Sequence, residues 1–159
     1  MRAPSFRGFT LIELVVTLAL VGVMAMLAMP LAELTTARAK ESELRLALRQ
    51  IRTSLDAYKS AADSGQIEKM ADQSGYPATL EDLTTPIVNI KNPKGTPFTF
   101  LRSVPRDPFE ADASLAAADT WNTRAYGSSP DSPSSGKDVF DVSSRSNKVG
   151  LNGVPYNKW

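Results

Sequence analysis

The sequence contains neither cysteine nor histidine, and these two absences restrict the chemistry that the chain can perform. Without cysteine, a disulfide or a thiolate metal site cannot form. Without histidine, the commonest general base and the commonest zinc ligand are missing, so neither a Ser-His-Asp triad nor a Cys-His pair can be assembled. Carboxylates and lysines remain as catalytic groups, but no spacing pairs two carboxylates for acid–base work. We therefore expect a protein that is not an enzyme.

A strong charge of either sign is also absent. The chain has 18 basic and 17 acidic residues, which leave a formal charge of +1 over 159 residues. Proteins that bind nucleic acid present a strongly basic surface, so no nucleic-acid partner is expected.

The apolar residues gather near the N-terminus, where residues 14–32 follow one another without a charge. About 20 apolar residues are enough to span a bilayer. A secretory signal has its small-residue cleavage site after the apolar stretch, whereas here the small residue, Gly8, comes before it. A cut after Gly8 would make Phe9 the new N-terminus and leave the whole apolar run on the mature chain. The segment therefore predicts a membrane anchor that is retained.

The charges around this run predict its orientation and one functional residue. Arg2 and Arg7 precede the run, and the positive-inside rule places their side in the cytoplasm. Glu13 stands at the start of the run, and acidic residues in membrane segments are usually functional. On a helix, Glu13 lies one turn from Phe9, so its carboxylate can meet the α-amine that a cut after Gly8 would expose.

Residues 8–14, Gly-Phe-Thr-Leu-Ile-Glu-Leu, resemble the cleavage and methylation signature of type IV prepilins and pseudopilins. The resemblance implies that a prepilin peptidase cuts after Gly8 and N-methylates Phe9. It also implies a role in filament assembly for Glu13 and a helix bend at Pro30.

Beyond the apolar run the helical pattern continues to about Ala62. Apolar residues recur at intervals of three and four, as on one face of an amphipathic helix, at Leu44, Leu48, Ile51, Leu55, Tyr58 and Ala62. This stripe packs either on the chain's own domain, which we favour, or as a coiled-coil seam on another protein. A basic stripe accompanies it at Arg45, Arg49 and Arg52, and is either solvated or faces acidic surfaces of adjacent subunits.

After Gly65 the chain is rich in proline, glycine and serine, which predicts short strands joined by loops. The strand candidates are residues 121–126 and 138–144, with a loop at 128–136 between them. Thr79 is expected to cap a short helical turn. Tyr156 and Trp159 are expected to form a hydrophobic plug at the C-terminal end.

These elements predict an α+β fold. A long N-terminal helix, transmembrane in its first half and amphipathic in its second, packs on a small C-terminal antiparallel β-sheet domain with long loops. We divide the chain into a cytoplasmic leader (1–8), a transmembrane and polymerisation helix (9–32), the amphipathic half of the helix (33–64) and a periplasmic globular domain (65–159).

Two further segments resemble the major pseudopilins of type II secretion systems. They are Tyr76-Pro77 with its two following leucines, and Pro105-Arg106-Asp107-Pro108-Phe109. The resemblance implies a structural subunit of a type II secretion pseudopilus, a periplasmic filament that drives protein export. Its implied partners are the prepilin peptidase, copies of itself, minor pseudopilins, an inner-membrane assembly platform and membrane lipid. The implied location is the inner membrane, as a single-pass protein with a cytoplasmic N-terminus and a periplasmic C-terminal domain, and afterwards the filament.

The same resemblance implies a calcium site in the C-terminal loop, but the loop at residues 142–150 is net basic here. Calcium requires six to eight oxygen ligands, several of them carboxylates. We therefore expect no cofactor and no metal. If calcium does bind, the candidates are Asp131, Asp138 and Asp141, although the last two point to opposite faces of a strand.

Two alternatives remain open. The first is a pilin or minor pilin of a type IV pilus, for adhesion, motility or DNA uptake; many adhesive pilins close a C-terminal loop with a disulfide, which this chain cannot form. The second is a membrane-anchored periplasmic enzyme or binding protein, for which the sequence offers no site that we can name.

Overall fold

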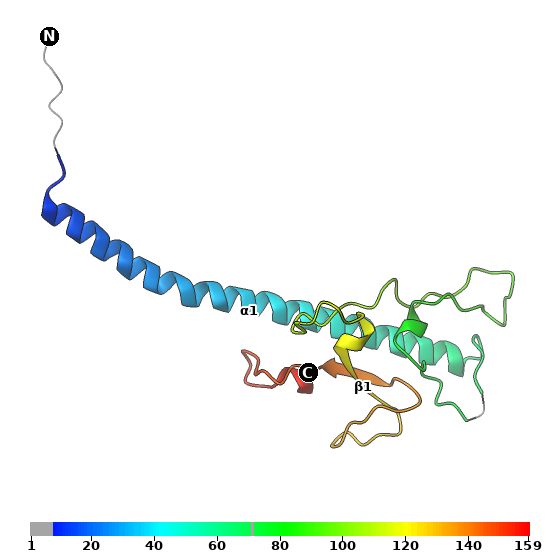
Figure 1. Cartoon of the computed structure of the whole chain (residues 1–159). Helices are drawn as coiled ribbons and strands as arrows, with labels where there is room; N and C mark the ends of the chain where they lie inside the picture. The colour runs from blue at the N-terminus through cyan, green and yellow to red at the C-terminus, as the bar shows by residue number, and fades with distance from the viewer. Residues whose placement is uncertain (1–7, 71) are drawn as a thin grey trace, which may run out of the picture. The chain divides into compact units, whose positions relative to one another are not determined.

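The computed structural model describes residues 8–70 and 72–159, and the side chains of all of these except residues 27–31. One helix dominates this part of the chain, α1 (Leu11–Asp63), with 53 residues (Figure 1). It agrees closely with the helix expected from about Thr10 to Ala62. Contacts divide the chain into two units, residues 1–39 and residues 40–159, and we describe each by itself.

In the first unit the described residues from 11 onward are helical, and α1 continues through Pro30 without a break in its assignment. The side chain of Pro30 lies outside the described residues, so the predicted bend stays a prediction. The apolar side chains of residues 11–26 are largely exposed; Leu18, for example, is 64% exposed. This half of α1 therefore presents apolar surface with no partner from its own unit.

In the second unit, the same helix buries its apolar stripe. Leu44, Ile51 and Leu55 are completely buried, and they share one core with residues far along the chain. Those residues include Leu83, Leu101, Trp121, Val142 and Tyr156. Burying a Leu or Ile side chain contributes about 1.5–3 kcal/mol. The prediction that the stripe packs on the chain's own domain is confirmed.

The sheet of the second unit has two antiparallel strands, β1 (Trp121–Arg124) and β2 (Asp141–Ser144). Trp121 pairs with Ser144, and Arg124 pairs with Asp141. In Figure 1, β1 and β2 (yellow to orange) lie beside the cyan-to-green part of α1. The predicted α+β class, with a long helix packed on a small antiparallel sheet, is confirmed.

Both strands are shorter than predicted, because the backbone groups at their outer ends bond elsewhere. The Val139 N–H donates to the Pro77 carbonyl oxygen (2.8 Å), so residue 139 is tied to another segment rather than to β1. The Ala125 N–H donates to the Ser134 carbonyl oxygen (2.9 Å), which turns the chain into the 125–138 loop. Long-range bonding of this kind leaves no signal in the local sequence.

The short turn near residue 80 is η1 (Glu81–Leu83), a 3-10 helix. Leu80 and Leu83 are both buried. The cap predicted at Thr79 is wrong, since the turn has no side-chain cap at its N-terminal end. Instead the Thr79 N–H donates to Asp82 Oδ2 at 2.8 Å. The Asp82 carboxylate, which lies within the turn, therefore accepts the hydrogen bond of the Thr79 backbone N–H that precedes the turn.

The C-terminal segment ends in η3 (Tyr156–Lys158) and forms the expected hydrophobic plug. The Tyr156 ring stacks on Phe109, with centroids 3.9 Å apart, and meets the edge of Trp159. Its hydroxyl donates to Oε1 of Glu41 on α1 (3.1 Å), and the Leu151 N–H donates to the same oxygen (2.6 Å). Glu41 is buried, so this carboxylate anchors the C-terminal segment to the helix.

A second buried carboxylate explains the Pro-Arg-Asp-Pro-Phe segment. Asp107 is 2% exposed and accepts hydrogen bonds from the Ser144 hydroxyl (2.5 Å) and the Phe109 N–H (2.8 Å). Its own N–H donates to the Thr120 hydroxyl (3.1 Å). Because a buried carboxylate is costly unless its oxygens are hydrogen-bonded, Asp107 is a structural link between this loop and β2.

Candidate functional site

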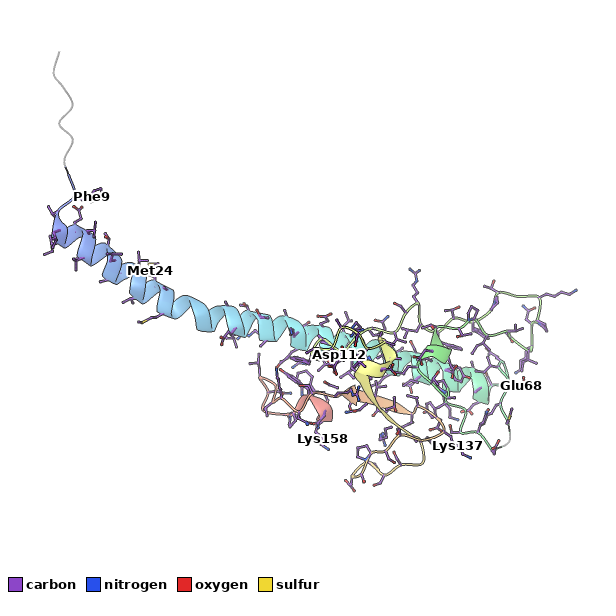
Figure 2. All side chains as sticks on the ribbon, in the orientation of Figure 1. Phe9, Met24, Glu68, Asp112, Lys137 and Lys158 are labelled. Atoms are coloured by element: carbon purple, nitrogen blue, oxygen red, sulfur yellow. The ribbon has the colours of Figure 1, made fainter. Side chains whose placement is uncertain are left out.

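The candidate site is the N-terminal segment around the bond between Gly8 and Phe9. Gly8, Phe9 and Thr10 precede α1, and all three are exposed. Phe9 is 83% exposed, and Figure 2 shows it ahead of the first helical turn. Exposed, non-helical backbone is where proteases cut most readily. The predicted cleavage bond is therefore accessible, whereas Arg2 and Arg7 of the predicted leader lie outside the described residues.

A reciprocal pair of hydrogen bonds sets the start of α1. The Glu13 N–H donates to the Thr10 hydroxyl oxygen (3.3 Å), and the Thr10 N–H donates to Glu13 Oε2 (3.5 Å). This arrangement is a capping box, in which a Ser or Thr and a Glu three residues later satisfy each other's free N–H groups. A cap of this kind contributes about 1 kcal/mol to a helix.

The capping box was missed in the sequence, although its Thr-x-x-Glu pattern before an apolar run was visible. It gives Glu13 a structural role in addition to the predicted role in assembly. Glu13 also lies in the first turn of α1, where the helix dipole favours a negative charge. Its carboxylate is thus held beside the backbone that directly follows Phe9.

Behind this site, α1 exposes apolar side chains on all sides. Between residues 8 and 26 the one charged residue is Glu13, and the large apolar residues there are 50–84% exposed. Within the part of the chain that the structure describes, none of the helices meets the length and hydropathy needed to cross a membrane. The span predicted over residues 9–32 includes residues 27–31, whose side chains are outside the described set.

The three calcium candidates do not gather into one site. Asp141 Oδ1 pairs with Arg52 Nε at 2.8 Å, and its Oδ2 lies 3.5 Å from Arg124. Asp138 Oδ1 accepts the Tyr126 N–H at 2.9 Å, and Asp131 is exposed in the 125–138 loop. Among residues 8–70 and 72–159 there is no group of three or more acidic, cysteine or histidine side chains placed to hold a metal ion.

One member of the basic stripe is part of the domain itself, which neither sequence interpretation anticipated. Besides its ion pair with Asp141, Arg52 donates to the Val142 carbonyl (2.9 Å) and to the backbone oxygen of Trp159 (2.7 Å). The guanidinium therefore links α1 to β2 and to the C-terminal segment. Arg49, by contrast, is exposed.

Comparison with known proteins supports the N-terminal site. Residues 4–29 match the family model described as the prokaryotic N-terminal methylation motif. No curated protein and no solved structure matches the chain significantly. The matched segment contains Gly8, Phe9 and Glu13, and the motif implies a membrane-anchored prepilin that is processed by a prepilin peptidase and polymerised. The chain thus carries the N-terminal methylation motif that is typical of the type IV pilin-like superfamily.

Proposed function

We propose that the chain is a structural subunit of a type II secretion pseudopilus. In this proposal a prepilin peptidase cuts after Gly8 and N-methylates Phe9. The mature chain is anchored in the inner membrane by residues 9–32, with residues 65–159 in the periplasm. It then polymerises, together with minor pseudopilins and on an inner-membrane assembly platform, into a periplasmic filament that drives protein export.

The observation that carries the proposal is the match to the methylation motif, with Gly8 and Phe9 exposed ahead of the helix. Proteins with this motif are generally structural subunits rather than enzymes. The large apolar surface of residues 11–26 supports the same conclusion, since soluble monomers rarely expose contiguous apolar patches beyond a few hundred Å². Lipid before assembly and neighbouring helices after assembly would cover it.

The proposed role of Glu13 follows from its position. A cut after Gly8 creates a positive α-amine on Phe9, next to the Thr10 N–H that the Glu13 carboxylate already accepts. The carboxylate can then pair with this amine, either within the chain or in a neighbouring subunit. In a water-poor helix bundle such a pair is far less costly than an isolated charge.

The proposal is tested by mass spectrometry and N-terminal sequencing of the full chain extracted from membranes, with the peptidase present. The expected result is a chain that begins with N-methylated Phe9 and is found in filaments. A chain that still begins with Met1 would overturn the proposal. Deletion of the gene distinguishes the two kinds of filament. If protein export stays normal after the deletion, the chain belongs to a type IV pilus and not to a secretion filament.

A further inference from the structure

The second unit has two surfaces of opposite charge. The first is a shallow groove of about 370 Å³, which we call the arginine groove. Three arginines line it, Arg45, Arg49 and Arg52, against a single carboxylate, Asp56. Arg52 is paired with Asp141, and Arg45 is paired with Glu41 (3.5 Å) and lies over the Trp159 ring. Arg49 has no ion pair among the described residues, so its charge is free to meet a partner.

The second surface is a pocket of about 780 Å³, which we call the acidic pocket. Four carboxylates line it, Glu68, Asp72, Asp82 and Asp138, against one lysine, Lys137. Glu68 and Asp72 are exposed and make no ion pair among the described residues. Figure 2 shows Glu68 and Lys137 near the end of the unit where α1 finishes. The pocket therefore has an excess of negative charge that the chain leaves unpaired.

The acidic pocket is also lined by aromatic rings. Tyr58, Tyr76 and Tyr126 line it, and the rings of Tyr76 and Tyr126 stack with centroids 5.7 Å apart. A guanidinium binds well between carboxylates and the faces of aromatic rings. Lys59, which is paired with Asp63, lies 5.7 Å from the Tyr76 ring centroid, so one cation of the chain already borders the pocket. The chemistry of the pocket matches an arginine side chain.

The two surfaces cannot meet within one molecule. Arg49 and Tyr58 are nine residues apart on α1, which is about 13 Å along the helix axis. When complementary surfaces lie at different places on one chain, each copy can bind the next, and the contact can repeat without closing. An open filament requires a contact of this heterologous kind.

We propose that the arginine groove of one copy docks into the acidic pocket of a second copy of this chain. Arg49 enters the pocket of the next subunit, close to Glu68 and Asp72. Leu46 is 65% exposed on the adjoining surface of α1 and adds apolar area to the contact. The inference deepens the proposed filament and rests on it, since it names the contact between subunits outside the N-terminal helix.

Cross-linking of the full chain tests the docking, because the protein has no cysteine of its own. Thr53→Cys lies in the arginine groove and Ala78→Cys in the acidic pocket, and both positions are exposed. The double variant should give a ladder of cross-linked oligomers. The control pairs Thr53→Cys with Thr96→Cys, which is exposed and does not line the pocket, and should give no ladder.

A charge exchange provides an independent readout. Arg49→Glu and Glu68→Lys should each lower the cross-linking yield about fivefold, as expected when an ion pair becomes a repulsion of about 1 kcal/mol. The double charge exchange should restore most of the yield. Lys94→Glu, an exposed basic position outside the groove, serves as the control and should leave the yield unchanged.

The outcomes separate this inference from the proposed function. Filaments of N-methylated subunits without the ladder would overturn the docking and leave the function standing. A ladder of cross-linked oligomers in the absence of filaments would support the docking but overturn the proposed filament function. The absence of both would overturn both. A ladder that persists at equal strength in Arg49→Glu would also overturn the docking, because the contact would not depend on the charge that defines it.

Discussion

The two halves of α1 differ in how many apolar residues they have, in how these residues are spaced and in what surrounds them. Residues 11–26 expose their apolar side chains on every face, whereas residues 44–55 bury all of theirs except Leu46 in one stripe against the domain. The first half has one charge, Glu13, and the second alternates apolar residues with arginines. Apolar residues spaced three and four apart among charged ones thus form one face that packs on the chain's own domain, whereas the nearly continuous apolar run has no such face. The half without a period needs another partner.

The largest effect is expected from removing the single charge of the first half. Glu13→Leu should still be cleaved after Gly8, because the cleavage bond lies ahead of the helix, but its filament yield should fall to a small fraction of that of the wild type. The variant lacks the carboxylate that we propose to pair with the new α-amine, and it also loses the capping box. Electron microscopy and N-terminal sequencing measure the two steps separately. Glu33→Leu, another exposed acid on α1, is the control and should assemble; normal filaments of Glu13→Leu would remove the role.

The next prediction compares the effect on domain stability of replacing one leucine in each half of α1. Leu55→Ala should lower the free energy of unfolding of the domain by about 2–5 kcal/mol, because it opens a cavity in the core. Leu18→Ala should change it by less than about 0.5 kcal/mol, because Leu18 has no core around it. Denaturation of the full chain in detergent, followed by tryptophan fluorescence, measures both, since both tryptophans lie in the second unit. Equal effects would contradict the comparison.

Within the basic stripe, two arginines should behave differently. Arg52→Ala should destabilise the domain by about 1–2 kcal/mol, because it removes the link from α1 to Asp141, Val142 and Trp159. Arg52→Lys should recover only part of this, since an ammonium cannot reproduce the planar geometry of the guanidinium. Arg49→Ala should be neutral for folding. The same denaturation assay measures these effects. A clear loss of stability in Arg49→Ala would show that Arg49 also helps to hold the domain together.

High pH should weaken the anchor between the C-terminal segment and α1. Burial, together with the hydrogen bond to Glu41, raises the pKa of Tyr156 above its ordinary value of 10.0. The native state therefore favours the neutral phenol, so its contribution is complete below about pH 10 and is lost as the pH rises through the raised pKa. Burial raises the pKa values of Tyr58 and Tyr76 in the same sense.

The Tyr156→Phe variant isolates this contribution. Its stability should fall less steeply above pH 10 than that of the wild type, because one of the three tyrosines no longer titrates. Thermal melting at a series of alkaline pH values measures the slope. Identical slopes for the two proteins would show that the hydrogen bond from Tyr156 to Glu41 does not contribute.

The smallest effect is expected from calcium. Adding calcium to the full chain should leave the Tm of the domain unchanged, because a ligand stabilises a protein only by binding its native state. Asp141, the central candidate, is already paired with Arg52 and Arg124. Addition of a chelator provides the control. A rise in Tm with calcium that the chelator reverses would establish a site.

Much of the fold was predictable because its signals are local. The three- and four-residue spacing of the apolar stripe predicted both the extent of α1 and its buried face. The positions of the two strands were predicted to within a few residues, since aromatic and β-branched residues between turn-forming residues favour strands. At the candidate site, Gly8, Phe9 and Glu13 were identified from the motif alone, and residues 4–29 match the corresponding family model.

What could not be predicted depends on pairs of residues far apart in the sequence. Arg52 and Asp141 are separated by 89 positions, and Glu41 and Tyr156 by 115. Each residue by itself resembles an ordinary surface charge or a C-terminal aromatic. The early end of β1 and the late start of β2 likewise depend on distant hydrogen bonds, at Ser134 and Pro77. The Thr10–Glu13 capping box is different, since its signal was local and was overlooked.

The sequence by itself determined the N-terminal motif, the long helix and the face of that helix that is buried, because each depends on residues within a few turns of one another. Only the tertiary structure decided which charges are committed and which are free. Arg52 binds β2 and the C-terminal segment, while Arg49, less than one turn away, remains exposed. The physical reason is that an ion pair requires two side chains to meet in space, and the folding of the domain brings residues 52 and 141 together. The arginine groove and the acidic pocket became visible in the same way, once the chain was folded.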